Sequence, residues 1–479
     1  MKNITKTRTN KSRKIYKSLS YILLLSALSA CSPVKTTYNL NITDITGQQL
    51  NAQYWQNKLQ NNETMSMKSQ DIAAFNQQLF ESDPHVVRPL ASLENLDKTA
   101  LIEKINDISS IPTSARFYAD GTELTPQNFA RYRDNLNIQD VKDNNIVQFG
   151  LVTKRSALRT FPTLDRVFNQ EMDLDLDRFQ ETGVFPSEAV AILHTSKDGK
   201  WLLVQNYNYL AWVQRDDIAI GDKQEIQAYL DHDDFLLVSG AKVHTSYVPN
   251  EPKISQIQLD MGVKLPLLSS TEQHNELYGQ STAGSYQVKL PVRNQDGSLS
   301  IKTALIGRTQ DVHEGYLEYT PENVIAQAYK FLGERYGWGH DYDGRDCTGF
   351  VGEIYKTFGI LMPRNSGQQG NGKYGTNFRF DEHSDPASKL AVIKKLQIGD
   401  LIYIPGHVMV YLGKENNQPI VIHDVKGLAY WTPEGQFVEG VLNAVSVTPL
   451  ITLQLNETTT YLDKIYNIKR LTLNNVEGH

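Results

Sequence analysis

Residues 346–351, Asp346-Cys347-Thr348-Gly349-Phe350-Val351, decide how the last part of the chain folds. Four glycines between positions 333 and 344 precede this stretch and are typical of a loop, and apolar residues then recur at helical spacing from Phe350 to Phe358. The pattern therefore places Cys347 at or just before the N-terminus of a helix. Unpaired backbone N–H groups and the helix dipole favour a thiolate there, where cysteine pKa values fall from about 8.5 to roughly 3.5–7.5. We expect a reactive thiol, against the alternative of a buried structural cysteine.

Two histidines downstream have the positions that a thiolate nucleophile needs, because its base must itself be oriented by a third group. Residues 401–404 read as a strand, and residues 407–412 read as a second strand, which His407 begins after a tight turn. His423 ends a third strand, and its separation of 16 residues from His407 suits neighbouring positions on paired strands. Each histidine taken alone reads more readily as structural. Together with Cys347 they fit a base and its orienting group.

Spacing and charge argue against two other kinds of ligand. One cysteine and two histidines could bind zinc, but this set lacks the close ligand pair of most zinc sites, so we expect no metal and no cofactor. The net charge of −6 is spread along the chain and provides no basic face, so we expect no nucleic-acid partner. The 479 residues allow about three domains at roughly 150 residues each.

The N-terminus has the pattern of an export signal. Basic residues from Lys2 to Lys17 precede an apolar stretch from Leu19 to Leu28, which is too short for a membrane span. Leu28-Ser29-Ala30-Cys31 then resembles a lipobox, in which Cys31 becomes the acylated first residue; the alternative is an ordinary signal peptide with an incidental cysteine. The chain has two cysteines. If Cys31 is acylated, Cys347 is a free thiol in an exported, usually oxidising setting, which favours a reactive role.

The middle of the chain has the pattern of short β-strands. Residues 189–194 and 201–205 read as strands, with the hairpin turn signal Asp198-Gly199 between them. Strands at this spacing suggest a small barrel. A second β-rich stretch covers about 230–310 and has a turn signal at Asp296-Gly297, so we expect a second barrel there.

The last part of the chain resembles the NlpC/P60 family of bacterial cell-wall cysteine peptidases. The motifs lie in the expected order over about 320–430. They are Tyr336-Gly337-Trp338-Gly339, Asp346-Cys347-Thr348-Gly349-Phe350, Gly399-Asp400-Leu401-Ile402 and His407-Val408-Met409-Val410-Tyr411-Leu412-Gly413.

This resemblance implies an α+β, papain-like catalytic domain with a Cys-His-His triad. Cys347 is then the nucleophile, His407 the base and His423 the residue that orients His407. Tyr336 corresponds to a tyrosine that assists the oxyanion hole.

The upstream part resembles bacterial SH3 domains, notably in Trp201 and the stretch from Tyr209 to Val213. The whole chain is similar to a subgroup with an N-terminal cap and two such domains, which cleaves between γ-D-glutamyl and the diamino acid of stem peptides. By this resemblance Asp346 binds the free amino group of the substrate. Thr348 and Ser366 line the pocket, and Tyr209 is a further candidate. From its residue type alone, Asp346 could equally cap the helix.

Two residues depart from the family pattern. Thr348 stands where serine is commoner, and His340 where a second glycine is frequent. The expected architecture is multidomain, with a peptidase domain preceded by two all-β SH3-like barrels and a small cap. The boundaries are 1–31 for the signal peptide, 32–62 for a tether, 63–145 for the cap, 146–225 and 226–312 for the barrels, 313–455 for the peptidase domain and 456–479 for a tail.

The function expected from these features is hydrolysis of murein stem peptides through an acyl-enzyme at Cys347. Two alternatives remain: a wall-binding SH3 protein with an inactive last domain, and an acyltransferase on the same fold. We expect an exported lipoprotein held in the membrane through Cys31. If the cell is Gram-negative, the lipoprotein would lie on the periplasmic face of the outer membrane, because Ser32, which follows Cys31, is not an aspartate.

Overall fold

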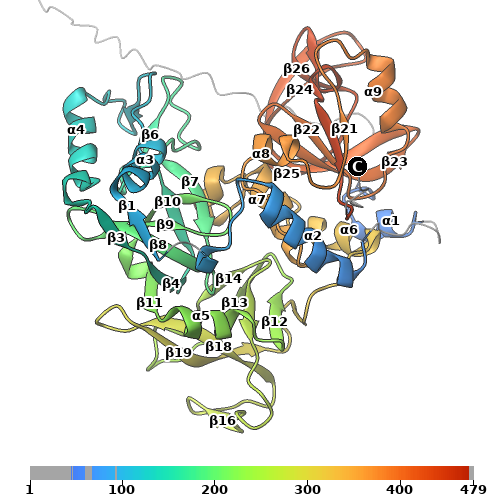
Figure 1. Ribbon diagram of the computed structural model, residues 1–479. Coiled ribbons are helices and arrows are strands. Elements are labelled where there is room, and N and C mark those ends of the chain that lie inside the picture. The colour runs from blue at the N-terminus through green and yellow to red at the C-terminus, as the bar shows by residue number, and fades with distance from the viewer. Residues whose placement is uncertain (1–44, 46, 60–66, 92–93, 474–479) are drawn as a thin grey trace, which may run out of the picture.

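The computed structural model describes residue 45 and residues 47–59, 67–91 and 94–473 (Figure 1). The expected signal peptide and Cys31 lie outside these residues, so their assignment stays a prediction. Within the described part of the chain, no helix is both long enough and apolar enough to cross a membrane.

A seven-stranded antiparallel sheet forms the first β unit, in the order β11-β4-β8-β9-β10-β5-β7. The expected hairpin at Asp198-Gly199 is confirmed, because it joins β8 to β9 and Gly199 has a positive φ of 70°. Alternating apolar residues fill the interior between the sheet and the helices beside it. The strands are β4 (Gln148–Val152), β5 (Ser156–Arg159), β7 (Gln180–Val184), β8 (Ala189–Thr195), β9 (Trp201–Gln205), β10 (Leu210–Gln214) and β11 (Ile218–Gly221).

The second β unit consists of small separate sheets around one apolar core. Asp296-Gly297 lies in the turn of its longest hairpin, between β18 and β19, as the sequence predicts. Its description as a second SH3-like barrel stays a prediction. The elements are α5 (Lys223–Leu230), β12 (Phe235–Val238), β13 (Lys242–His244), β14 (Gln258–Asp260), β15 (Lys264–Pro266), β16 (Glu276–Leu277), β17 (Gln280–Ser281), β18 (Ser285–Arg293), β19 (Leu299–Gly307) and β20 (Val312–Glu314).

The catalytic unit packs helix α7 on one face of an eight-stranded sheet in the order β21-β28-β22-β23-β24-β26-β27, with β25 paired to β24. Apolar side chains of α7, such as Phe350 and Ile354, share a core with Val408 and Ile422 of the sheet. The elements are α6 (Pro321–Tyr329), α7 (Cys347–Lys356), α8 (Ser366–Asn371), β21 (Thr376–Arg379), α9 (Pro386–Ile393), β22 (Leu401–Ile404), β23 (His407–Glu415), β24 (Gln418–Trp431), β25 (Phe437–Pro449), β26 (Leu453–Asn456), β27 (Thr459–Thr460), α10 (Tyr461–Lys464) and β28 (Asn467–Arg470).

The predicted tail at 456–479 is wrong for residues 456–470. Strand β28 lies between β21 and β22, and Ile468 pairs with both Phe378 and Ile402. Ile465 and Ile468 are buried in an apolar cluster that includes Ile402 and Met409 of the sheet. The peptidase domain therefore extends well beyond residue 455.

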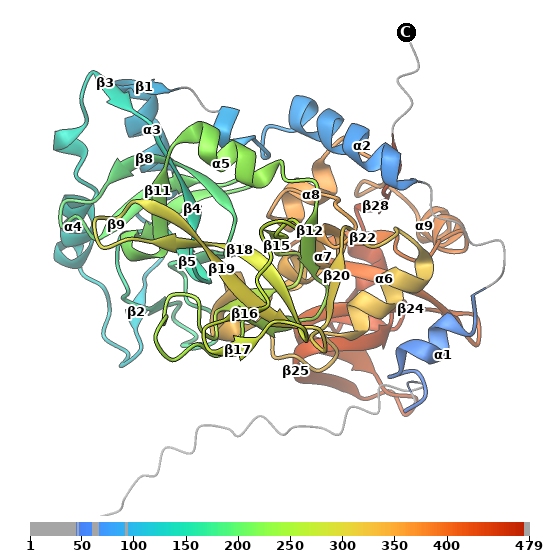
Figure 2. The same cartoon turned by 90° about the horizontal axis from the view of Figure 1, so that it is seen from below.

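The N-terminal boundaries also need correction. Within the predicted tether, helix α1 (Ala52–Gln56) packs on α6 and buries Trp55, whose Nε1 donates to the Gln49 carbonyl at 2.9 Å. The predicted single cap is divided between two units (Figure 2). Helix α2 (Ser69–Ser82) packs on the catalytic core, whereas α3 (Lys98–Ile108) and α4 (Pro126–Asn135) cover the first β sheet. The remaining short strands are β1 (Asn95–Asp97), β2 (Phe117–Tyr118), β3 (Asn144–Ile146) and β6 (Val167–Phe168).

Candidate active site

Cys347 is the first residue of helix α7, as the sequence predicts. Asp346 is the N-cap, and its Oδ1 accepts a hydrogen bond from the Gly349 backbone N–H at 2.8 Å. The Cys347 side chain is nearly buried, and its Sγ lies 4.0 Å from the Gly406 carbonyl oxygen. The turn between β22 and β23 therefore lies directly against the candidate nucleophile.

The two histidines come together on paired strands. His407 begins β23, His423 lies in β24, and these strands pair at Val410 and Ile422. Nε2 of His407 and Nδ1 of His423 share a hydrogen bond of 2.8 Å, and Nε2 of His423 is 2.9 Å from the Thr448 hydroxyl. Because Nε2 of His407 is engaged, Nδ1 is the ring nitrogen left to exchange a proton with a thiol.

The pKa of Cys347 is raised to about 12, contrary to the lowered value expected at a helix N-terminus. Burial is the largest cause, and the carboxylates of Asp346 and Asp424 add to it. Burial also lowers the pKa of His407 to about 4 and that of His423 well below its ordinary value. Near neutral pH the resting site therefore holds a neutral thiol and neutral imidazoles.

Asp346 is fully engaged by groups of this chain. Its Oδ1 also accepts from the Thr348 hydroxyl at 3.0 Å, and its Oδ2 accepts from the Gly339 N–H at 3.1 Å and from Arg364 at 2.7 Å. Burial alone would raise the pKa of Asp346, but the Arg364 guanidinium holds that pKa below its usual range. The capping geometry is thus present, and amine binding by Asp346 stays a prediction.

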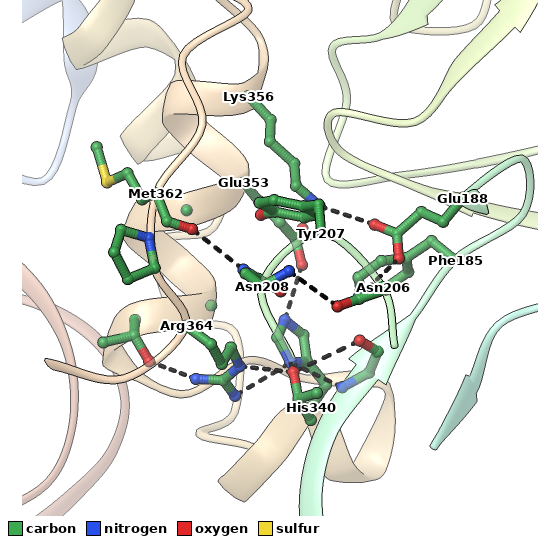
Figure 3. Close-up of a pocket in the computed structure, with 16 residues that line it drawn as sticks. Phe185, Glu188, Asn206, Tyr207, Asn208, His340, Glu353, Lys356, Met362 and Arg364 are labelled. Atoms are coloured by element: carbon green, nitrogen blue, oxygen red, sulfur yellow. Dashed lines mark hydrogen bonds and ion pairs between the residues drawn. The ribbon is translucent and has the colours of Figure 1, made fainter. Parts of the chain in front are cut away.

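Arg364 and His340 join the first β unit to the catalytic helix (Figure 3). His340 Nδ1 accepts from the Gly183 N–H at 3.2 Å, and Nε2 lies 3.1 Å from Glu353 Oε1 on α7. His340 stands where glycine is frequent in the family. Its φ is 66°, a backbone conformation that glycine adopts more readily. Arg364 and His340 line a small cavity between the two units.

Strand β7 forms a wall beside this site. Gln180 Nε2 donates to the Gly339 carbonyl at 2.8 Å, and the Trp338 indole N–H donates to the Gln180 carbonyl at 3.2 Å. On the same wall, the Tyr209 hydroxyl donates to Glu181. The carboxyl group of Glu181 is poorly solvated, and this burial raises its pKa.

The remaining predicted residues have different surroundings. Tyr336 is nearly buried, and burial, followed by the charges of Asp346 and Cys347, raises the pKa of its hydroxyl. Ser366 begins α8, and its carbonyl accepts from the Tyr466 hydroxyl at 3.3 Å. The roles of Tyr336 and Ser366 stay predictions.

Sequence reasoning did not find Arg364, Glu181 or Asp424. Arg364 follows a proline in a loop, and Glu181 lies in a strand of another unit, so local sequence gives no signal for either. Asp424 directly follows His423 and is fully buried; among the described residues neither of its oxygens has a hydrogen-bond partner. Within the same part of the chain, no group of three or more His, Cys, Asp or Glu residues is placed to hold a metal ion.

Comparison with known proteins identifies two domains. Residues 162–214 match the SH3 domain of the SH3b1 type, and residues 333–443 match the NlpC/P60 family. The structure of an NlpC/P60 endopeptidase from Photobacterium damselae subsp. piscicida is similar with a TM-score of 0.68 at 18% identity, covering 88% of this chain and 97% of that chain. At that identity the likeness shows the fold.

Curated relatives align with parts of the chain. Dipeptidyl-peptidase 6 of Lysinibacillus sphaericus is 25% identical over 233 residues, 45% of this chain and 71% of the relative. A gamma-D-glutamyl-L-lysine dipeptidyl-peptidase of Bacillus cereus is 30% identical over 181 residues, 36% of this chain and 45% of the relative. A probable endopeptidase p60 of Listeria seeligeri is 32% identical over 113 residues, 22% of this chain and 18% of the relative. The chain thus spans less than half the length of the last two. The chain carries an SH3 domain of the SH3b1 type followed by an NlpC/P60 domain, and this second domain is that of a cysteine-type peptidase.

Proposed function

We propose that this peptidase is a murein hydrolase that cleaves the bond between γ-D-glutamate and the diamino acid of stem peptides, with Cys347 as nucleophile. The observation that carries the proposal is the His407–His423 pair, joined at 2.8 Å between β24 and β23, the strand that begins beside Cys347. The name of the Bacillus cereus relative specifies a γ-D-glutamyl-L-lysine dipeptidyl-peptidase, which supports the choice of bond.

Acylation begins with both catalytic groups neutral. Sγ of Cys347 attacks the γ-carbonyl carbon while Nδ1 of His407 takes the thiol proton, so that no separated charge pair is needed beforehand. The carbonyl oxygen gains negative charge, which the N–H groups at the start of α7 and the Tyr336 hydroxyl would stabilise. His423 and Thr448 hold the His407 ring in position throughout.

The intermediate then collapses in the usual order for acyl transfer. The C–N bond breaks, His407 gives its proton to the departing amine of the diamino acid, and a thioester remains on Cys347. Water attacks the thioester carbon as His407 accepts a proton from it. The Cys347 thiol is re-formed, and the peptide leaves with a free γ-carboxylic acid on its D-glutamate.

The wall that strand β7 of the SH3 domain forms beside the site, here called the SH3 wall, supports a preference for short peptides that end inside the site. An incoming amino terminus is positively charged and costly to bury unpaired. We propose that Asp346, with Tyr209 nearby, provides the acidic end of the pocket lined by Thr348 and Ser366. Since Arg364 already holds Asp346, the amine must share or replace that contact; Glu181 is a second carboxylate on the same wall.

We further propose that the chain acts at the cell envelope as a lipoprotein anchored through Cys31, with SH3-like domains that hold wall peptides close to the site. The envelope setting agrees with relatives such as the bifunctional muramidase/DL-endopeptidase CwlT of Bacillus subtilis, to which the chain is 28% identical over 125 residues.

The test uses L-Ala-γ-D-Glu-L-Lys and L-Ala-γ-D-Glu-diaminopimelate, each with a free or an acetylated amino terminus, with products identified by mass. The parent is expected to release the diamino acid from the free peptides and to resist the acetylated ones. Cys347→Ala should fold normally and release nothing. Turnover by Cys347→Ala would exclude Cys347 as the nucleophile. Equal rates on free and acetylated peptides would exclude a pocket that is closed at one end.

Amine binding and helix capping by Asp346 predict different results for Asp346→Asn. If Asp346 binds the amine, the variant loses the preference for free peptides more than it loses stability. If Asp346 acts as a cap alone, the melting temperature falls and the preference is unchanged.

A further inference from the structure

Arg364 connects three parts of the molecule that meet at Cys347. It lies in the loop before α8 and is nearly buried. Its Nε donates to the Thr182 hydroxyl on β7 at 2.5 Å, and its Nη1 donates to the Thr348 hydroxyl (Figure 3). Its Nη2 donates to Asp346 at 2.7 Å. Each nitrogen of the guanidinium thus has its own acceptor.

This use of three nitrogens explains why arginine stands at this position. A guanidinium is a rigid planar fork with five N–H donors, whereas a lysine ammonium is a single point on a flexible stem. One ammonium could pair with Asp346, but it could not hold Thr182 and Thr348 in the same plane. The contact with Thr182 matters most, because that residue belongs to the SH3 domain.

Arg364 also supplies positive charge beside the nucleophile. The charge of Asp346 opposes ionisation of the thiol, as does that of Asp424 once it is ionised, whereas Arg364 favours ionisation. The ionisable groups around Cys347 are Asp346 at the start of α7, Arg364 before α8, Asp424 on β24, Tyr336 before η4 (Trp338–Asp343), Tyr403 on β22, Tyr461 on α10 and His407 on β23.

We propose that Arg364 is a positioning residue of the peptidase and that the SH3 domain, by holding Arg364 through Thr182, completes the active site. Arg364 fixes Asp346 and so the first turn of α7, and it offsets negative charge when the thiolate forms. This inference rests on Cys347 as the nucleophile and does not depend on which peptide bond is cut.

A purely structural role is the competing explanation, since a buried arginine that neutralises a buried carboxylate stabilises any fold. Arg159 provides a matched control. It is nearly buried in the SH3 sheet, where it pairs with Asp177 at 3.0 Å and donates to Gln180 at 3.1 Å. Arg159→Lys should lower the melting temperature without changing the titration of Cys347.

The experiment compares Arg364→Met, Arg364→Lys, Thr182→Val and Arg159→Lys in the full chain. The rate at which iodoacetamide alkylates Cys347 is measured against pH, and kcat and KM are measured on L-Ala-γ-D-Glu-L-Lys. Arg364→Met should slow alkylation at fixed pH, because loss of the positive charge raises the thiol pKa and the thiolate population falls tenfold for each unit of that rise. Arg364→Lys should keep the alkylation profile and lose kcat. Thr182→Val should lose kcat in the same way.

Two results would overturn the proposal: an alkylation profile in Arg364→Met equal to that of the parent, or a parental kcat in both Arg364→Lys and Thr182→Val. If Arg364→Met does not fold, the latter two variants decide the question. If the parent fails to cut the peptide, the murein function is wrong, and the alkylation profiles still test Arg364.

Discussion

Acidification is expected to destabilise the fold through His407. Burial lowers the pKa of His407 to about 4, whereas a histidine in an unfolded chain titrates near 6.5. Between these values the unfolded chain binds a proton that the folded chain does not. The stability contributed by the neutral imidazole is therefore complete above pH 6.5 and is lost as the pH falls to about 4. Each pH unit in this window is worth about 1.4 kcal/mol, which gives a total loss of about 3 kcal/mol.

The assay is urea unfolding of the parent, His407→Gln and His383→Gln between about pH 7 and pH 4. His383 is the control, because its side chain is 86% exposed. The free energy of unfolding of the parent and of His383→Gln should fall by about 3 kcal/mol more than that of His407→Gln over this range. The same series on His423→Gln reports the coupling across the shared hydrogen bond. Equal pH dependence in the parent and His407→Gln would refute the reasoning.

Three further predictions concern single residues. His407→Ala should abolish hydrolysis, because it removes the proton acceptor, whereas His423→Ala should keep a measurable rate; a larger loss of kcat at His423 would reverse the two roles. Asp424→Asn should raise the melting temperature, by more at neutral pH than at about pH 5. Burial raises the pKa of Asp424, so keeping its proton costs the folded chain more as the pH rises. An unchanged or lower melting temperature would contradict this. Cys31→Ser should release the protein from membranes after a high-salt wash, and retention of the variant would place the anchor elsewhere.

Much of the catalytic domain follows from local sequence because its signals are local. The loop glycines, the N-cap at Asp346 and the apolar period from Phe350 onward define the start of α7 within a few residues. The short turn before His407 likewise sets β22 against β23, and the next strand then brings His423 into reach. These contacts arise between neighbouring elements, which sequence patterns describe well.

The errors concern segments whose partners are distant in sequence. Strand β28 is four residues long and pairs with β21 and β22, more than sixty residues earlier, so nothing near it distinguishes it from a tail. Trp55 lies in a short helix with mostly polar neighbours, yet it completes a core that α6 and β23 build. The role of Arg364 could not be predicted from local sequence, because its partner Thr182 belongs to the SH3 domain.

The state of the thiol shows how tertiary structure overrides a local rule. A helix N-terminus offers roughly half a positive charge, which favours the thiolate. In the folded chain Cys347 is nearly buried and faces Asp346 and Asp424, and these effects together raise its pKa to about 12. The same burial lowers the pKa of His407, so thiol and imidazole stay neutral until a substrate arrives. In the proposed mechanism, proton transfer and attack then occur together, and the positive charge of Arg364 acts as the thiolate begins to form. As proposed above, the SH3 domain holds that charge in place through the contact of Thr182 with Arg364 and so completes the active site.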